Sequence, residues 1–190
     1  MSLQTPKEWD ERYGRAEYWA GTEPVGFLRN VLPLLKRGAA LDIATGEGRN
    51  AVFLAQHGWH VTAIDRSAAG LEKAAALARM RGADERRLTF IQADLENYAL
   101  PVGAFEVVLC CYYLQRSLFP AMAAALRQGG TLVFETYTTD QLQYREGPRC
   151  PDHLLRPGEL LHAFSGLEVL FYSESNSGKG IASLLARKHS

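Results

Sequence analysis

The chain has 190 residues, and its 21 Lys and Arg residues balance its 21 Asp and Glu residues, so the formal net charge is zero. This length predicts a single domain over residues 1–190. Zero net charge argues against a general binder of nucleic acid or membrane surfaces, because both need a basic face. The three cysteines are odd in number and two are adjacent, which argues against a disulfide framework. They form no CxxC pair, which argues against a structural zinc site, and no metal is expected.

No apolar run approaches the roughly 18 residues of a membrane span, and Met1 to Glu8 lack the apolar core of a signal peptide. We therefore expect a cytoplasmic protein. We also expect a monomer or a weak homodimer.

The first half of the chain alternates helix and strand signals. Thr5-Pro6-Lys7-Glu8 has the residues of a helix start: a capping Thr, Pro at the first helical position and Glu three residues after the cap. Ser67 is the expected cap of an Ala-rich helix. We expect helices over 6–20, 24–37, 50–57 and 68–80, and strands over 39–44, 59–65 and 87–92.

The second half continues this alternation and ends in a predicted hairpin, so the last strand should run antiparallel. Alternating strands and helices favour right-handed crossovers and a parallel sheet. The expected fold class is α/β, with a doubly wound, Rossmann-like, seven-stranded, mostly parallel sheet and helices on both faces. The remaining expected elements are strands over 105–110, 131–137, 167–172 and 181–186, and helices over 118–127 and from Pro157 onward.

A glycine loop follows the first expected strand, in the run Asp42-Ile43-Ala44-Thr45-Gly46-Glu47-Gly48-Arg49-Asn50-Ala51. Glycines at a strand-to-helix turn let a ligand approach the backbone, and the next helix offers unpaired N–H groups at its start. Asp65 ends the second strand, where its carboxylate can accept both ribose hydroxyls of a nucleotide. The loop therefore predicts a nucleotide-like cofactor.

Two cofactors fit this loop. Gly46 to Ala51 match the G-x-G-x-x-A form of the dinucleotide fingerprint, which leaves an NAD(P)-binding oxidoreductase as an alternative. S-adenosylmethionine (SAM) fits better, because three acids stand at three successive strand ends: Asp42 for its amino-acid end, Asp65 for the ribose and Asp94 for the adenine amino group. An acid at position 42 would oppose a pyrophosphate.

These residues resemble those of the class I SAM-dependent methyltransferases and, within them, the small bacterial tellurite-resistance (TehB-like) group. Gly48-Arg49-Asn50 and Leu126-Arg127-Gln128-Gly129-Gly130 are similar to motifs of these families. The family commonly has Gly where Ala44 stands and often Cys where Thr45 stands. The expected function is methyl transfer from SAM to a small-molecule acceptor, with S-adenosylhomocysteine (SAH) as product; a non-catalytic SAM-binding module is a further alternative. The expected cofactor-binding residues are Tyr13, Asp42, Ala44, Thr45, Gly46, Gly48, Asn50, Asp65, Arg66, Asp94, Leu95 and Cys110.

The acceptor should bind beyond the carboxyl ends of the fourth and fifth strands. The TehB-like resemblance implies a thiol, a chalcogen oxyanion or a similar soft nucleophile, and no catalytic residue is assigned. Residues 1–22 are expected to form a helical lid, and the aperiodic stretch 137–157 a substrate-side loop. The substrate-side candidates are Tyr112, Tyr113, Arg116, Tyr137, Arg145 and Arg149.

Overall fold

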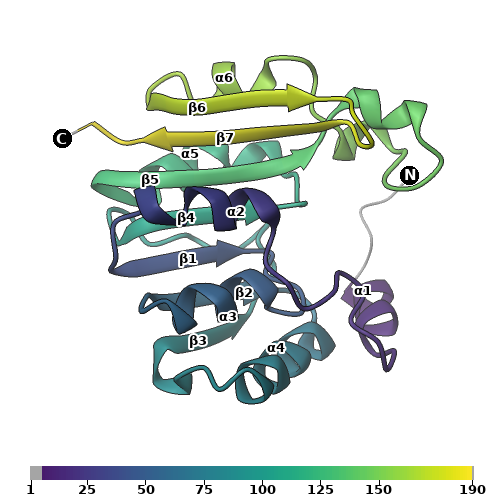
Figure 1. The fold of residues 1–190 in the computed structure, drawn as a ribbon, viewed down its shortest axis with the longest axis vertical. Helices are drawn as coiled ribbons and strands as arrows, with labels where there is room; N and C mark the ends of the chain where they lie inside the picture. The colour runs from purple at the N-terminus through teal and green to yellow at the C-terminus, as the bar shows by residue number, and fades with distance from the viewer. Residues whose placement is uncertain (1–5, 190) are drawn as a thin grey trace. The chain divides into compact units, whose positions relative to one another are not determined.

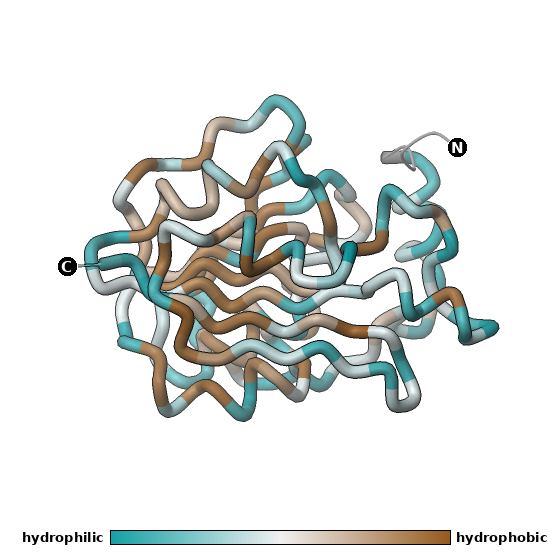
Figure 2. The backbone as a smooth tube through the Cα atoms, turned by 90° about the horizontal axis from the view of Figure 1, so that it is seen from above, coloured by the Kyte–Doolittle hydropathy of each residue, from teal (hydrophilic) through white to brown (hydrophobic). Residues whose placement is uncertain are grey.

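The computed structural model describes residues 6–189 (Figure 1), so the expected cap Thr5 lies outside the described residues. The chain divides into two compact units, Met1–Ala99 and Leu100–Ser190. Brown, hydrophobic residues run along the strands and teal, hydrophilic residues mark many of the connections (Figure 2).

The first unit contains a parallel sheet with the strand order β3-β2-β1. Its strands are short apolar runs, and four of the five residues of β1 are buried. Parallel strands bring their carboxyl ends to one edge of the sheet, so the residues that follow β1, β2 and β3 lie along that edge. The elements are α1 (Pro6–Tyr13), α2 (Gly26–Val31), β1 (Ala39–Ile43), α3 (Arg49–Gln56), β2 (His60–Asp65), α4 (Ala68–Met80) and β3 (Leu88–Gln92).

The second unit contains a mixed sheet with the strand order β4-β5-β7-β6. β4 and β5 are parallel, whereas β7 is antiparallel to both β5 and β6. The hairpin of β6 and β7 arises because a short polar connection cannot support a crossover. The elements are β4 (Phe105–Cys111), α5 (Phe119–Ala125), β5 (Leu126–Tyr137), α6 (Glu159–Ala163), β6 (Glu168–Ser175) and β7 (Ile181–Arg187).

The seven-stranded sheet thus takes three strands from the first unit and four from the second. It is mostly parallel with an antiparallel hairpin at its end, which confirms the predicted fold class. Ser67 caps α4 as expected, since its hydroxyl accepts a hydrogen bond from Gly70 N at 3.0 Å.

The N-terminal helix is shorter than predicted. It ends at Tyr13, and Gly14 N closes the last turn on Asp10 O at 2.7 Å. Glycine is a poor helix former, so the chain leaves the helix there. The helix predicted over 24–37 is also interrupted: α2 ends at Val31 and a 3-10 turn over Leu32–Leu34 follows, because Pro33 cannot donate an α-helical hydrogen bond.

The boundary between α5 and β5 also differs from the prediction, which extended the helix to residue 127. The helix ends at Ala125, and Leu126 pairs with Phe105. The pairing then skips ahead, so that Val107 lies opposite Thr131. Lys188 explains the early helix end, because its Nζ donates to Leu126 O at 2.8 Å and to the carbonyls of residues 123 and 124. A lysine at a helix C-terminus satisfies carbonyls that have no partner within the helix.

The stretch over residues 137–157 contains two 3-10 turns, Thr139–Gln143 and Pro151–His153. Its two ends are joined by backbone hydrogen bonds, Thr139 N to Leu155 O and Leu155 N to Tyr137 O, both at 2.9 Å. The segment therefore leaves and returns to the second unit at one place.

Candidate functional site

The glycine loop connects β1 to α3 through three residues in the left-handed region. Ala44 has φ +54°, Gly46 +57° and Gly48 +80°. Gly48 also lies close to α4, because a Cβ there would lie 2.4 Å from the Cβ of Ala74. A Cβ on Gly46 would lie 2.9 Å from the Tyr13 hydroxyl. Gly48 is therefore required by space as well as by backbone conformation, and Gly46 by its backbone conformation.

Asp42 is buried at the end of β1, with 1% of its surface exposed. The Thr45 hydroxyl donates to its Oδ2 at 2.6 Å. Burial raises the pKa of Asp42 to about 7, partly offset by the Thr45 hydrogen bond and reinforced by the charge of Asp65. A nearby cation stabilises the ionised form of a buried carboxyl with this pKa. The site therefore favours a ligand with an ammonium group over one with a phosphate.

Asp65 holds the loop in place at the end of β2. Its Oδ2 accepts from Gly46 N at 2.7 Å and its Oδ1 accepts from Ser67 N at 2.9 Å. Burial raises its pKa, while these backbone hydrogen bonds lower it. Each carboxylate oxygen has a second lone pair, so the carboxylate retains acceptor capacity for a hydroxyl.

The third acid, Asp94, follows β3 and forms an ion pair with Arg66 at 3.1 Å. Its Oδ1 accepts from Glu96 N, and the neighbouring Leu95 is buried. The structure therefore joins most of the predicted cofactor residues of the first unit in one series of contacts, running from Thr45 and Asp42 through Gly46 and Asp65 to Arg66 and Asp94.

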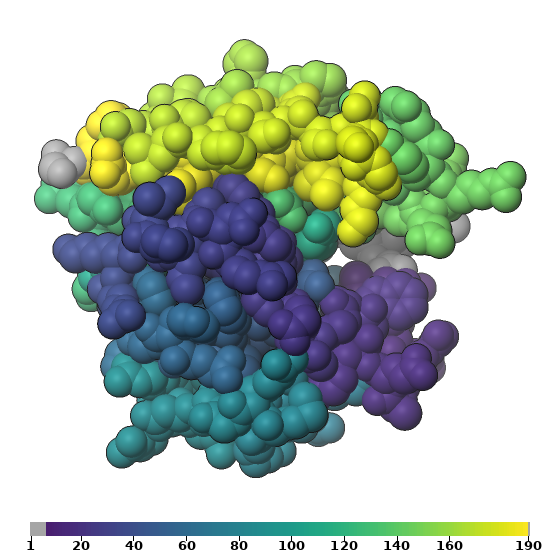
Figure 3. Space-filling view, in the orientation of Figure 1, coloured from purple at the N-terminus to yellow at the C-terminus, as the bar shows by residue number. Residues whose placement is uncertain are grey.

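Helix α1 lies against this loop. Tyr13 contacts Gly46, and burial next to the negative charges of Asp65 and Glu47 raises the pKa of its hydroxyl. Asp10 docks the same helix on the N-terminus of α4, because its Oδ1 accepts from the Ser67 hydroxyl at 2.5 Å and from Ala69 N at 3.2 Å. In Figure 3 the purple N-terminal atoms lie against the blue and teal atoms of this unit.

Residues 14–25, here called the N-terminal strap, are fastened by a buried ion pair that the sequence did not indicate. Lys73 Nζ contacts Glu47 Oε1 at 2.9 Å and donates to Glu17 O at 2.6 Å. The second oxygen of Glu47 accepts from Ala20 N, and Arg49 donates to Ala20 O. Glu47 stands inside the glycine motif, yet its partner comes from α4, so sequence reasoning had no signal for the pair.

Asn50 has a structural contact in this arrangement. It is buried, and its side-chain oxygen accepts from Val25 N at 3.0 Å. It thus ties α3 to the end of the N-terminal strap, and a role in holding the cofactor stays a prediction.

The predicted residues of the second unit fall into separate groups. Tyr112 and Tyr137 lie together, with ring centroids 5.2 Å apart. Tyr112 donates to Glu135 Oε1 at 3.0 Å, and Glu135 was not among the predicted residues. Cys110 is buried and its thiol donates to Tyr113 O, while the Tyr113 hydroxyl donates to Gln115.

The predicted arginines do not converge. Arg116 binds both carboxylate oxygens of Glu159 at 2.5 and 3.0 Å and the backbone oxygens of Asp152 and Leu154, so it fastens the segment before α6. Arg149 donates to Tyr144 O and is exposed, as is Arg145. Arg116 therefore has a structural contact, and a substrate-side role for Arg116, Arg145 and Arg149 stays a prediction.

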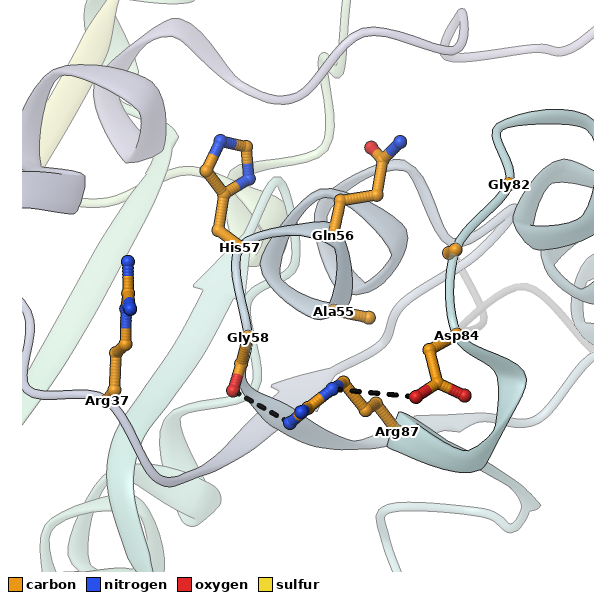
Figure 4. Close-up of a pocket in the computed structure, with 9 residues that line it drawn as sticks. Arg37, Ala55, Gln56, His57, Gly58, Gly82, Asp84 and Arg87 are labelled. Carbon is orange, nitrogen blue, oxygen red and sulfur yellow. Dashed lines mark hydrogen bonds and ion pairs between the residues drawn. The ribbon is translucent and has the colours of Figure 1, made fainter.

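A cavity of about 620 Å³ lies in the first unit, away from the glycine loop (Figure 4). Its lining includes Gly58, which precedes β2, and Arg87, which precedes β3, so it lies at the amino ends of the strands. Arg87 spans it, with a hydrogen bond to Gly58 O at 3.1 Å and an ion pair to Asp84 at 3.7 Å. Because the predicted cofactor residues lie at the opposite edge, the cavity contains none of them. Its lining is Arg37, Ala55, Gln56, His57, Gly58, Gly82, Ala83, Asp84 and Arg87.

Comparison with known proteins finds a family model that matches part of the chain. Residues 40–130 match the family model described as "Methyltransferase domain". A putative methyltransferase of Bacillus subtilis, YqeM, is 28% identical over 140 residues, covering 69% of this chain and 53% of that protein. The chain spans about half the length of the curated relatives it matches.

Solved structures show the same fold. TehB of Haemophilus influenzae has a TM-score of 0.71 at 16% identity, covering 96% of this chain and 66% of that chain. The [4+2]-cyclase SpnF has a TM-score of 0.67 at 20% identity, covering 82% of this chain and 76% of that chain. The predicted resemblance to class I SAM-dependent methyltransferases and TehB is thereby confirmed at the level of the family match and the fold. No helix among residues 6–189 has the length and apolar character to cross a membrane.

Proposed function

We propose that this chain, which resembles the class I SAM-dependent methyltransferases, transfers a methyl group from SAM to a small-molecule acceptor. The observation that carries the proposal is the set of acids at the carboxyl edge of the first unit, where two of three are buried with raised pKa values. Such a site favours a ligand with positive charge and disfavours a pyrophosphate. When bound, SAM supplies a sulfonium-activated methyl group.

In this proposal the chain binds SAM and the acceptor, orients them and excludes water. This is the protein's part in most cofactor reactions. Asp42 attracts the ammonium of the amino-acid end, Asp65 accepts from the ribose hydroxyls, and Asp94 accepts from the adenine amino group. Tyr13 and the N-terminal strap cover the glycine loop as a lid. Support for the lid comes from the contacts of Tyr13 with Gly46 and of Asp10 with Ser67.

The proposed acceptor is a thiol, a chalcogen oxyanion or a similar soft nucleophile. We propose that residues 137–157 contribute to its binding and that Tyr112, Tyr113 and Tyr137 lie on the acceptor side. Zero net charge supports a protein without a nucleic-acid partner, and a cytoplasmic monomer or weak homodimer completes the proposal.

A second candidate is a SAM-binding protein that catalyses no methyl transfer. The similarity in fold to a [4+2]-cyclase favours keeping it, because one fold hosts different reactions. Consumption of SAM with a panel of thiols, phenols, selenite and tellurite separates the two. Tight SAM binding without turnover of any acceptor would favour the second candidate.

Asp65→Ala tests the cofactor site by calorimetry with SAM, SAH and NADH. We expect SAM affinity to fall at least about tenfold, because a hydrogen bond to a charged group contributes roughly 1.5–3 kcal/mol and 1.4 kcal/mol is tenfold. Asp84→Ala, which removes an acid from the distant cavity, should leave the affinity unchanged. Binding of NADH but not SAM at millimolar concentration would refute the proposed function.

A further inference from the structure

A buried acid lies at the carboxyl edge of the second unit. β4 and β5 are parallel, and Cys111 at the end of β4 pairs with Glu135 near the end of β5. Tyr112 follows β4 directly, and Ser183 of β7 pairs with Glu135 from the other side. Ligands of open α/β sheets bind outside the carboxyl ends of the strands, so these side chains stand where an acceptor is expected.

Glu135 is held by hydroxyl groups rather than by a cation. It is buried, with 7% of its surface exposed. Its Oε1 accepts from the Tyr112 hydroxyl at 3.0 Å, and its Oε2 accepts from the Ser183 hydroxyl at 2.6 Å. None of the ion pairs among residues 6–189 includes Glu135. Burying a carboxylate without a cation costs free energy of folding. Its presence at this edge therefore indicates a functional role.

Tyr112 is held over this acid in a strained conformation. It has φ +57°, in the left-handed region that residues with a side chain rarely adopt. Two bonds to one residue maintain it, since Tyr112 N donates to Glu135 O at 2.7 Å and the hydroxyl donates to the carboxylate. Burial and the charge of Glu135 raise the pKa of the Tyr112 hydroxyl, so it keeps its proton. Strain maintained in this way is typical of a functional position.

This arrangement accepts protons and repels negative charge. A carboxylate can only accept hydrogen bonds, and a tyrosine hydroxyl that donates to it keeps lone pairs for a second donor. An oxyanion would meet the carboxylate charge here. The hydroxyls of Tyr112 and Ser183 donate to the carboxylate, and the Tyr137 ring lies beside that of Tyr112.

We propose that Tyr112 and Glu135 form a proton relay for a neutral, proton-bearing acceptor, namely a thiol or a phenol, and that the acceptor is not an oxyanion. The inference rests on the proposed function and narrows its substrate class. The acceptor's S–H or O–H donates to the Tyr112 hydroxyl. As the acceptor heteroatom bonds the methyl carbon, the carbon–sulfur bond breaks with its electron pair left on sulfur. The acceptor proton then passes to Tyr112, and the tyrosine proton passes to Glu135.

Tyr112 is in this proposal the catalytic residue, and Glu135 is a positioning residue that acts through it. The variants are therefore Tyr112→Phe, which removes the relay hydroxyl, and Glu135→Gln, which removes the charge. Glu174→Gln is the matched control, because Glu174 also accepts from a tyrosine, Tyr172, but is exposed on β6. Circular dichroism of each variant establishes that it is folded.

The probes are 4-nitrophenol, whose anion is yellow and whose neutral form is colourless, and selenite. With SAH present, the wild type should bind 4-nitrophenol in its neutral form, so the yellow absorbance falls on binding. In Glu135→Gln the apparent pKa of the bound probe should fall by about one unit, which is a tenfold change in preference. Tyr112→Phe should lose methylation of a thiol probe at least about tenfold, an effect of roughly 1.4 kcal/mol, with SAH affinity retained.

Three results would overturn the relay. One is binding of the yellow anion, or of selenite, in preference to the neutral phenol. A second is absence of both phenol and thiol binding at millimolar concentration in a protein that binds SAH. A third is equal behaviour of Glu135→Gln and Glu174→Gln. A wild type that binds neither SAM nor SAH would instead refute the proposed function, and the relay with it.

Discussion

At the scale of single residues, the glycine loop shows a cost that the chain carries at Ala44. Its φ of +54° lies in the region that glycine adopts freely and alanine does not. The family pattern with Gly at this place follows from the same geometry. Alanine has the smallest side chain of the residues with a Cβ, so it adds little bulk at this left-handed position.

Ala44→Gly should therefore stabilise the protein. We expect a gain of roughly 0.5–1 kcal/mol, because the left-handed strain is removed, and a rise in Tm of about 1–4 °C. Thermal unfolding followed by circular dichroism measures the shift. Ala76→Gly, inside α4, is the matched control and should lower Tm, since glycine is unfavourable within a helix. Equal shifts for both variants would show that Ala44 carries no strain.

The pKa of Asp42 predicts how cofactor binding depends on pH. In the folded protein this pKa is about 7, raised from 3.8 mainly by burial. Below pH 7 the carboxyl is neutral and offers an ammonium little attraction; above pH 7 it is ionised. SAM affinity should thus rise as pH increases through about 7, with a proton released on binding.

Calorimetry of SAM binding across this pH range measures the effect. Asp42→Asn should bind SAM more weakly at high pH and lose the pH dependence, because its side chain does not ionise. Asp84→Asn should keep the wild-type profile. An Asp42→Asn protein with an unchanged slope would assign the titration to another group.

At the scale of elements, the N-terminal strap depends on one buried ion pair. The Glu47 side chain is 1% exposed and that of Lys73 18%, and their contact is 2.9 Å. The pair links the glycine loop to α4, and Lys73 also holds Glu17 O. The N-terminal strap is thereby fixed to the glycine loop and to α4.

Lys73→Met should be strongly destabilising, by roughly 3–5 kcal/mol, because it leaves the buried carboxylate of Glu47 without a cation. The double variant Glu47→Gln with Lys73→Met should recover most of this loss. Urea denaturation measures both values, and hydrogen exchange at Ala20 N reports release of the strap. Lys179→Met, on an exposed connection, should change stability by less than about 0.5 kcal/mol. A Lys73→Met loss no larger than that would mean the pair is not an anchor.

At the scale of the whole molecule, equal numbers of acids and bases conceal an uneven distribution. Acids gather at the carboxyl edge of the first unit, and the arginines of residues 145–156 stand in the second. Because the buried acids destabilise the protein without a cation, a ligand that neutralises them should raise its stability.

SAM should therefore protect the folded protein against heat more than NADH does. A ligand at 100 times its Kd stabilises by about 2.7 kcal/mol, which for this size corresponds to a Tm rise of roughly 5–10 °C. Differential scanning calorimetry with SAM, SAH and NADH at equal concentration measures it. A larger shift with NADH would contradict the cofactor assignment.

Local patterns were sufficient for much of this structure. The order of strands and helices, the Ser67 cap and the acids after β1, β2 and β3 were all predicted, because each depends on residues close together in the chain. The errors fell at element ends: Gly14 and Pro33 shorten two helices locally, and a distant residue contributes at a third. At the end of α5, Lys188 satisfies carbonyls from 62 to 65 residues away in the chain. No pattern near residue 125 predicts this contact.

The sequence by itself determined the fold class and the glycine loop and favoured SAM over NAD(P) as the cofactor. Burial periodicity, turn residues and charged strand ends are all visible over short stretches of the chain. Only the tertiary structure showed that Glu47 pairs with Lys73, that Arg116 is occupied by Glu159, and that Glu135 lies beneath Tyr112. Their separations along the chain are 26, 43 and 23 residues. Contacts of that range depend on how strands and helices pack, and a single sequence does not encode them as a recognisable pattern.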